Sequence, residues 1–384
     1  MQLDGGVIWI RSSTVNCSSS STLPSGTAYS AAAIAGVSGA SISETQQQNN
    51  VTVWIGYSVV TCSSSANGVN DGGTADSISA SAIGGVAAGL CSVSQAQEAV
   101  AVWIGYSNVS SSSRAMSSAT NAFTSSVVAG VVAVFMPDSI SQSQCNVTIW
   151  IGYSNVSSYA FSTYRNVMTT SAVAGVASGP RDSSSVPNQV VQDTVTVWIG
   201  YSNVSSSGQA ISTTSSSQYC FFQSYSAVSG VATDAAVIAQ NNLTAWIGFS
   251  TLTSSGNGSS DYPGCGELTA GGTSASTVAG ASASLSGAST TSTNSWLWTA
   301  CASISSTSSQ TPASSASATV AQGCPPSLSN ASDCCGTNTA LLLSALPAVF
   351  EPPVYGIPPG VCSQWCPPGY TLQAGECLAD PGTT

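Results

Sequence analysis

The side chains that could perform chemistry are few in this sequence, because it contains no Lys, no His and four Arg. Without Lys and His there is no Schiff-base amine, no imidazole base and no histidine metal ligand. The 15 acidic residues are scattered along the chain, whereas cleavage of a polysaccharide needs two carboxylates together. Folding would have to join residues such as Asp182 and Asp234 to make such a pair. We therefore expect no enzyme, no cofactor and no metal site.

Asparagine is the residue whose sequence context does indicate chemistry. The pattern Asn-x-Ser/Thr, the acceptor for N-linked glycans, occurs nine times. The acceptors are Asn16, Asn50, Asn108, Asn146, Asn155, Asn203, Asn242, Asn257 and Asn330. Ser and Thr, with 78 and 36 copies, offer further acceptors for O-linked glycans. Covalent N-glycans are expected partners, and O-glycans are a second option.

Thirteen cysteines in a chain without a reactive-site pattern indicate disulfides and an oxidising compartment. We therefore expect the protein outside the cell or on its surface. No signal peptide is visible, so we expect a mature form or a piece of a longer precursor.

Charge is scarce: charged residues make up 5% of the 384 residues and the net charge is −11. Four Arg cannot neutralise a nucleic-acid backbone, which excludes nucleic acid as an expected partner. The longest apolar run, near 340–350, falls short of the roughly 20 residues that a bilayer requires. A hydrophobic content of 42% also argues against disorder.

The strongest signal is internal repetition. The segment Val51–Ser58, which reads VTVWIGYS, recurs with small changes at 100–107, 147–154, 195–202 and 243–250. Spacings between the marker tryptophans from Trp9 to Trp296 run 45, 49, 47, 48, 48 and 50. A second motif, of the type Val128-Ala-Gly-Val131, falls between them. Each repeat thus has two β-branched stretches joined by Ser-, Gly- and Asn-rich loops.

One repeat of this length cannot bury its own apolar face, but stacked repeats can. We therefore predict an all-β fold: a parallel β-helix (β-solenoid) of about seven coils of roughly 48 residues with long Ser-rich loops. We read one coil per repeat, and two short coils per repeat remain an alternative. The solenoid is expected over 1–310, followed by a Pro- and Cys-rich, disulfide-stapled module over 311–384.

A glycan on Asn50 would fix the faces of the strand that follows it, because side chains alternate along a strand. The predicted inner set is Val51, Val53, Ile55 and Tyr57. The predicted outer set is Thr52, Trp54, Gly56 and Ser58. This pattern gives an outward strip of tryptophans beside glycines, a surface for a sugar ring or another chain. The strip consists of Trp54, Trp103, Trp150, Trp198 and Trp246. The alternative is that these tryptophans are buried, for example under a long loop.

The repeat also sorts the acceptor asparagines into two columns. Asn50, Asn146 and Asn242 lie four residues before a Trp in alternate repeats, about 9.6 Å apart, which leaves room for glycans. The second column lies five residues after the Trp in successive repeats, about 4.8 Å apart. Its members are Asn108, Asn155 and Asn203. They are either glycan acceptors or an asparagine ladder at a corner with left-handed backbone.

In-register stacking also predicts disulfides, because it brings equivalent Cα atoms to about 4.8 Å. Cys17 and Cys62 both lie eight residues after their Trp, so we predict that they are bonded. By similar reasoning the further predicted pairs are Cys220–Cys265 and Cys91–Cys145.

The tail beyond Thr311 has a different character, with eleven of the sixteen prolines and six cysteines. The spacing of Cys366–Cys377 resembles one piece of an EGF-like, Cys-rich extracellular module. Its apolar stretch, Leu341–Val354, is either the core of that module or a segment that docks elsewhere.

The rhythm Asn-Val-Thr-Val/Ile-Trp-Ile-Gly-Tyr-Ser-Asn-Val-Ser resembles parallel β-helix repeats in large surface glycoproteins of flagellate protists, over roughly Val7–Ser303. The resemblance implies an extracellular structural or adhesive role, in a surface coat or in flagellar hairs (mastigonemes). We expect a structural subunit of a glycosylated filament, whose copies join head to tail through solenoid ends and the tail. The alternative is an adhesin or carbohydrate-binding protein that uses the Trp/Gly strip.

Overall fold

The computed structural model shows an all-β chain. The residues that it describes are 2–24, 26–39, 45–69, 76–90, 94–118, 121–135, 141–164, 166–178, 189–213, 221–233, 237–260, 271–278, 281–283, 289–293, 296–300, 302–311, 316–320, 370–373 and 376–379. In this part of the chain there is no helix, and so none that could cross a membrane.

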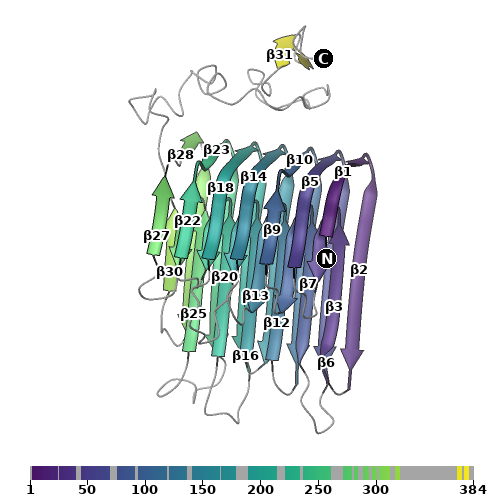
Figure 1. Cartoon of the computed structure of the whole chain (residues 1–384), viewed down its shortest axis with the longest axis vertical. Helices are drawn as coiled ribbons and strands as arrows, with labels where there is room; N and C mark the ends of the chain where they lie inside the picture. Colours follow the sequence, from purple (N-terminus) through teal and green to yellow (C-terminus); the bar gives the residue numbers. More distant parts are fainter. Residues whose placement is uncertain are drawn as a thin grey trace. The chain divides into compact units, whose positions relative to one another are not determined.

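Four parallel sheets run along the first part of the chain (Figure 1). Each coil adds one level to each sheet, except that no strand of sheet 4 is described in the seventh coil. Sheet 1 contains β1 (Gln2–Arg11), β5 (Thr45–Gly56), β9 (Ser94–Glu98) with β10 (Ala101–Gly105), β14 (Ser141–Gly152), β18 (Gln189–Gly200), β22 (Val237–Asn241) with β23 (Thr244–Gly248), and β27 (Ser289–Thr293) with β28 (Trp296–Ala300). Sheet 2 contains β2 (Thr14–Leu23), β6 (Val59–Gly68), β11 (Asn108–Ser117), β15 (Asn155–Tyr164), β19 (Asn203–Ser212), β24 (Thr251–Ser260) and β29 (Ser303–Thr311).

Two further sheets complete each coil. Sheet 3 contains β3 (Ala28–Ile34), β7 (Ser77–Ile83), β12 (Asn121–Val128), β16 (Asn166–Val173), β20 (Phe221–Val228), β25 (Gly271–Val278) and β30 (Ala316–Val320). Sheet 4 contains β4 (Val37–Gly39), β8 (Val86–Leu90), β13 (Val131–Phe135), β17 (Val176–Ser178), β21 (Val231–Thr233) and β26 (Ala281–Ala283).

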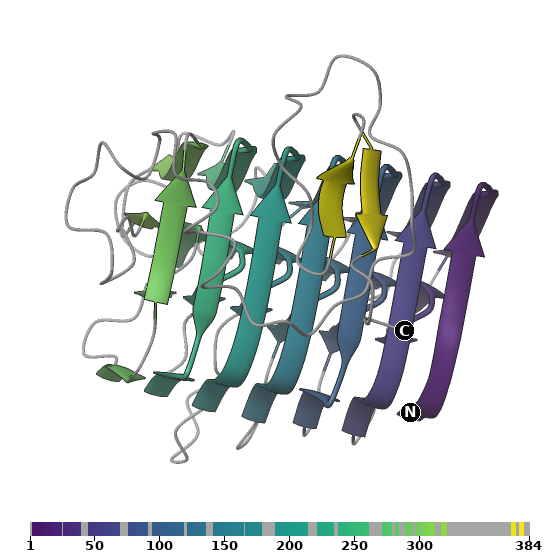
Figure 2. The same ribbon diagram turned by 90° about the horizontal axis from the view of Figure 1, so that it is seen from above.

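The predicted parallel β-solenoid with one coil per repeat is confirmed. The register aligns each position with its copy in the next repeat, so that Trp54 pairs with Trp9 and Trp103. Figure 2 shows the strands of successive coils following one another in sequence order. Each repeat supplies four strand positions where the sequence indicated two, because Ser-rich segments expected to be loops form strands of sheets 2 and 3.

By contact the chain divides into two compact units, Met1–Trp298 with Ala302–Gln322, and Thr299–Cys301 with Gly323–Thr384. In the second unit the structure describes one antiparallel pair, β31 (Tyr370–Gln373) and β32 (Glu376–Ala379).

The apolar core of the solenoid lies against the second half of the sheet 1 strands. Val53 and Ile55 are fully buried there, together with Val60 of sheet 2 and Ile83 of sheet 3. The same positions are buried in the four coils that follow, up to Val278, so the core is a set of continuous aliphatic columns. Each buried side chain of this size contributes about 1.5–3 kcal/mol relative to an exposed one.

Between sheets 2 and 3 the interior is lined by serine. Buried hydroxyls alternate between the two sheets and donate to one another at 2.9–3.0 Å from coil to coil. The chain of hydroxyls runs through Ser81, Ser111, Ser126, Ser158, Ser171, Ser206, Ser226, Ser254, Ser276 and Ser306. Serine is therefore abundant partly because it packs inside a thin interior, where the hydroxyls of this chain hydrogen-bond to one another.

A glutamine ladder lies on the inner side of sheet 1, ahead of the apolar columns. Gln97, Gln144, Gln192 and Gln240 each donate from Nε2 to Oε1 of the glutamine in the preceding coil, at 2.8–2.9 Å. The ladder begins at Gln48, and all five side chains are at most 3% exposed. Such a ladder forms only when consecutive coils are in register, because a shift would leave buried amides unpaired.

The corner between sheets 3 and 4 explains the second sequence motif. Its first turn residue has left-handed backbone, with φ of 53° at Ala35 and 58° at Ala129. Its second is glycine, and a Cβ on Gly130 would lie 2.3 Å from the carbonyl oxygen of Gly175 in the next coil. Glycine is thus required here for the coils to approach closely.

Candidate functional site

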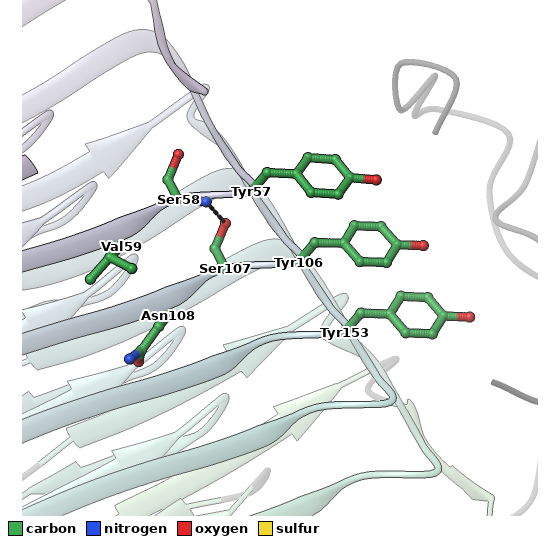
Figure 3. Close-up of a pocket in the computed structure, with 7 residues that line it drawn as sticks. All are labelled: Tyr57, Ser58, Val59, Tyr106, Ser107, Asn108 and Tyr153. Carbon is green, nitrogen blue, oxygen red and sulfur yellow. Dashed lines mark hydrogen bonds between the residues drawn. The ribbon is translucent and has the colours of Figure 1, made fainter. Parts of the chain in front are cut away.

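The corner between sheets 1 and 2 carries an outward column of aromatic rings (Figure 3). Tyr57, Tyr106, Tyr153, Tyr201 and Phe249 occupy the same position in five successive coils. Neighbouring ring centroids lie 4.8–4.9 Å apart, and the ring planes differ by 1–5°. We call these five residues the aromatic column.

The sequence Gly-Tyr-Ser forms this corner by a defined set of hydrogen bonds. Tyr57 has left-handed backbone with φ of 53°, and its N–H donates to the Gly105 carbonyl of the next coil. The following Ser58 turns inward, where its Oγ donates to the Gly56 carbonyl at 2.8 Å. Its N–H donates to Oγ of Ser107 at 3.1 Å, and this serine ladder continues through the later coils.

The left-handed corner overturns part of the predicted alternation. Tyr57 was expected inside and Ser58 outside, whereas Tyr57 is 36% exposed and Ser58 is 4% exposed. One left-handed residue shifts the alternation, so the side chains beyond it change faces. For a bulky side chain this backbone conformation costs about 1–2 kcal/mol, which ring stacking of about 0.5–1.5 kcal/mol offsets in part. Strain of this kind concentrates at functional positions.

Beside the rings lies an open groove of about 450 Å³. Figure 3 shows three tyrosine rings in a row, with their hydroxyl groups pointing away from the strands. The groove is lined by Tyr57, Ser58, Val59, Tyr106, Ser107, Asn108 and Tyr153. Val59 is 45% exposed and occupies in its coil the position that Asn108 has in the next. The groove therefore contains the exposed apolar side chain of Val59 and, in the next coil, Asn108, the first residue of the second asparagine column.

The tryptophans predicted as an exposed strip are buried. Trp54, Trp103, Trp150, Trp198 and Trp246 are 2–5% exposed. They do lie on the face opposite the aliphatic core, since Val53 and Ile55 on either side of Trp54 belong to that core. Their rings stack on one another at centroid distances of 4.5–5.1 Å. Each ring also covers the glycine two residues later, and a Cβ on Gly152 would lie 2.1 Å from the Trp150 ring.

The first column of acceptor asparagines, Asn50, Asn146 and Asn242, is exposed at a bulge in sheet 1. Their φ values of 50–52° are left-handed, and Ala99 and Thr194 share this conformation in the intervening coils. Asparagine thus has a backbone reason to occur at this position. The left-handed conformation that we considered for the second column belongs to the first.

The second column of acceptor asparagines lies at the first position of strands β11, β15 and β19 in sheet 2. Asn108 pairs in register with Asn155, which pairs with Asn203, and all three are exposed. Asn16 is also exposed and accepts a hydrogen bond from Thr61 Oγ1 at 2.6 Å, while Asn257 is partly buried. Asn330 lies outside the described residues.

The predicted disulfide Cys17–Cys62 is present, with a Cα–Cα distance of 4.6 Å. Cys62 is fully buried and aligns with Ser111, so the disulfide occupies the column that later coils fill with serine hydroxyls.

The prediction for Cys145 is wrong, because its thiol is free. The residues aligned with it in the adjacent coils are Glu98 and Asp193, so stacking offers it no cysteine partner. Burial raises the pKa of this thiol, and the charges of Asp193 and Glu98 raise it further. Its predicted partner Cys91, the pair Cys220–Cys265, and the acidic pair Asp182 and Asp234 all lie outside the described residues.

Comparison of the chain with protein-family models, curated proteins and solved structures finds no match. The function is therefore argued from the geometry of the solenoid and its surface columns.

The aromatic column predicts a loss of stability at alkaline pH. Burial raises the pKa of the Tyr106 phenol above its ordinary value of 10.0, and the neighbouring Tyr57 raises it further. Above about pH 10 the unfolded phenol loses its proton while the folded one keeps it, so the unfolding free energy falls as pH rises. Below that pH this contribution is fully present.

Urea unfolding at about pH 9 and about pH 11 measures this loss. In Tyr106→Phe, which keeps the ring, the loss should be smaller than in the parent chain. An equal loss in both proteins would show that Tyr106 does not carry the effect.

Proposed function

We propose that the protein is a structural subunit of an extracellular glycosylated filament, in which copies join end to end. The observation that carries this proposal is a contrast within one column of side chains. Trp9 is 60% exposed, whereas the aligned tryptophans of the next five coils are 2–5% exposed. The first coil thus exposes a kind of surface that, in the later coils, is covered by a neighbouring coil.

The backbone of the first coil supports the same interpretation. Strands β1, β2, β3 and β4 pair on one side with β5, β6, β7 and β8, and no described strand pairs with their other side. Val7 and Tyr29 of this coil are 63% and 40% exposed. An open parallel edge with exposed apolar side chains is a template for another chain.

The strands of the last described coil are compatible with such a contact. Strands β27, β29 and β30 pair with the preceding coil, and no described strand lies beyond them. The sequences of β27, β28, β29 and β30 contain no charged residue, so charge repulsion does not oppose stacking. Because the two ends are different surfaces, joining them is a head-to-tail contact. The coils follow one another along one stacking direction, and a contact that continues this stacking produces an open filament.

The extracellular and glycosylated parts of the proposal rest on the Cys17–Cys62 disulfide and on the exposed asparagine columns. We propose no catalytic role, because the chain lacks Lys and His. The alternative function as a carbohydrate-binding protein required an exposed Trp/Gly strip, and burial of Trp54 and its copies removes that support.

Adding charge to the first coil tests end-to-end assembly. The double substitution Val7→Lys/Trp9→Lys places two positive charges on the open edge, where lysine blocks strand addition. Electron microscopy and sedimentation should show filaments for the parent chain and single particles for the double variant. Tyr159→Lys, at a residue that is 40% exposed on sheet 2, is the matched control and should still assemble.

Circular dichroism establishes that each variant keeps its β-structure. A parent chain that stays monomeric at all concentrations would remove the proposal, and so would filaments that form equally well from the double variant.

The spacing of the acceptor asparagines predicts which of them carry glycans. Asn50, Asn146 and Asn242 are two coils apart, about 9.6 Å, and should be modified together. Asn155 lies about 4.8 Å from Asn108 and Asn203, too close for glycans on neighbours in one folded molecule. Glycopeptide mapping of intact native protein measures this, and full modification of all three second-column residues would contradict it.

A further inference from the structure

We propose that the aromatic column is a site of oxidative cross-linking, at which a peroxidase-type oxidant with hydrogen peroxide joins tyrosines of successive coils as dityrosine. The link would tie one coil covalently to the next on the outer surface of the solenoid. This inference extends the proposed structural role, since it gives a noncovalent stack covalent strength. Its test uses single chains in dilute solution, so it stands or fails separately from filament assembly.

The geometry of the column brings the reactive carbons of adjacent rings opposite each other. Tyr57, Tyr106, Tyr153 and Tyr201 are spaced 4.8–4.9 Å, with ring planes within 2° of parallel. Because in-register stacking relates the rings by translation, each ortho carbon faces the equivalent carbon of the next ring at about the centroid spacing. Figure 3 shows Tyr57, Tyr106 and Tyr153 pointing the same way, with the hydroxyl end of each ring outward. To form the bond, two such rings must turn out of the parallel stack so that one ortho carbon of each meets the other, and their outward position leaves solvent on one side for this movement.

The chemistry balances with hydrogen peroxide as the oxidant. Each of two phenols loses one electron and one proton, which leaves two phenoxyl radicals with spin density on the ortho carbons. These carbons form one C–C bond, and the hydrogen on each moves as a proton to its own oxygen, which restores both phenols. The pair loses two hydrogens overall, and the peroxide accepts two electrons and two protons to become two molecules of water.

The other tyrosines that the structure describes as exposed lack this geometry. Tyr159 is 40% exposed, about as much as Tyr57 at 36%, but it aligns with Ser112 and Ser207. Tyr29 is also 40% exposed and aligns with Ile78. If exposure alone governed the reaction, these residues would react as the column does. If stacking governs it, they form no link within the chain.

The last ring of the aromatic column limits how far cross-linking can extend. Phe249 stacks on Tyr201 at 4.8 Å but has no phenol hydroxyl, so no radical coupling reaches that coil. The four tyrosines make three adjacent pairs, and each phenol has two ortho carbons, so the column gives at most three links per chain.

The experiment treats the full chain, diluted until it is monomeric, with peroxidase and limiting hydrogen peroxide. Dityrosine fluorescence measures yield, and peptide mapping by mass spectrometry locates each link by its loss of two hydrogens. We expect links between adjacent column tyrosines, with a yield per chain that does not change on dilution. In Tyr106→Phe, which keeps the stacked ring, the maximum falls from three links to one, between Tyr153 and Tyr201.

Two further variants make the test decisive. Phe249→Tyr should create a new cross-linked peptide that joins position 249 to Tyr201, which no loss of folding could produce. Tyr159→Phe, the matched control, should leave the yield unchanged. Links that map to Tyr159 or Tyr29, a yield that falls on dilution, or no link between column residues would overturn the proposal.

Discussion

Every strand residue of the solenoid lies about 4.8 Å from the residue at the same position of the next coil, and this constraint decides which side chains the structure accepts. Aromatic rings stack at this spacing, amides hydrogen-bond and hydroxyls form chains, whereas like charges repel. The charged residues of the strands accordingly face uncharged neighbours. Arg114 aligns with Ser65 and Phe161, and Glu98 aligns with Asn49 and Cys145. The scarcity of charge in the sequence follows from the stacking.

The sequence predicted the features that depend on the period of the repeat. The recurring Trp motif was enough to predict one coil per repeat, and the shared offset of Cys17 and Cys62 was enough to predict their bond. Features that depend on backbone conformation within a coil were missed. A left-handed Tyr57 interrupts the alternation of faces, and period-two reasoning has no means of locating such a residue. Burial of Trp54 was left as an alternative to exposure, because a glycine two residues after a tryptophan is compatible both with a covering ring and with a flat exposed surface.

The same constraint connects the fold to the proposed function. A stack of similar coils leaves an open layer, and the exposure of Trp9 beside its buried copies marks that layer chemically. Repetition also places columns of side chains on the outer surface. The second asparagine column and the aromatic column meet there in the groove that contains Asn108. The proposed assembly through the ends, glycans on the sides and covalent links between tyrosines would all use positions that the repeat multiplies.

Deletion of one full repeat tests the central claim that each repeat is one in-register coil. Removal of residues 108–154 joins Ser107 to Asn155, the same junction that Ser154 makes in the parent chain. The account predicts a folded protein one coil shorter, with parent-like circular dichroism and cooperative unfolding, because Gln97 and Trp103 then face Gln192 and Trp198. Removal of residues 108–130, about half a coil, should prevent folding. If the full-repeat deletion unfolded the chain as completely as the half-repeat deletion does, the account would be wrong.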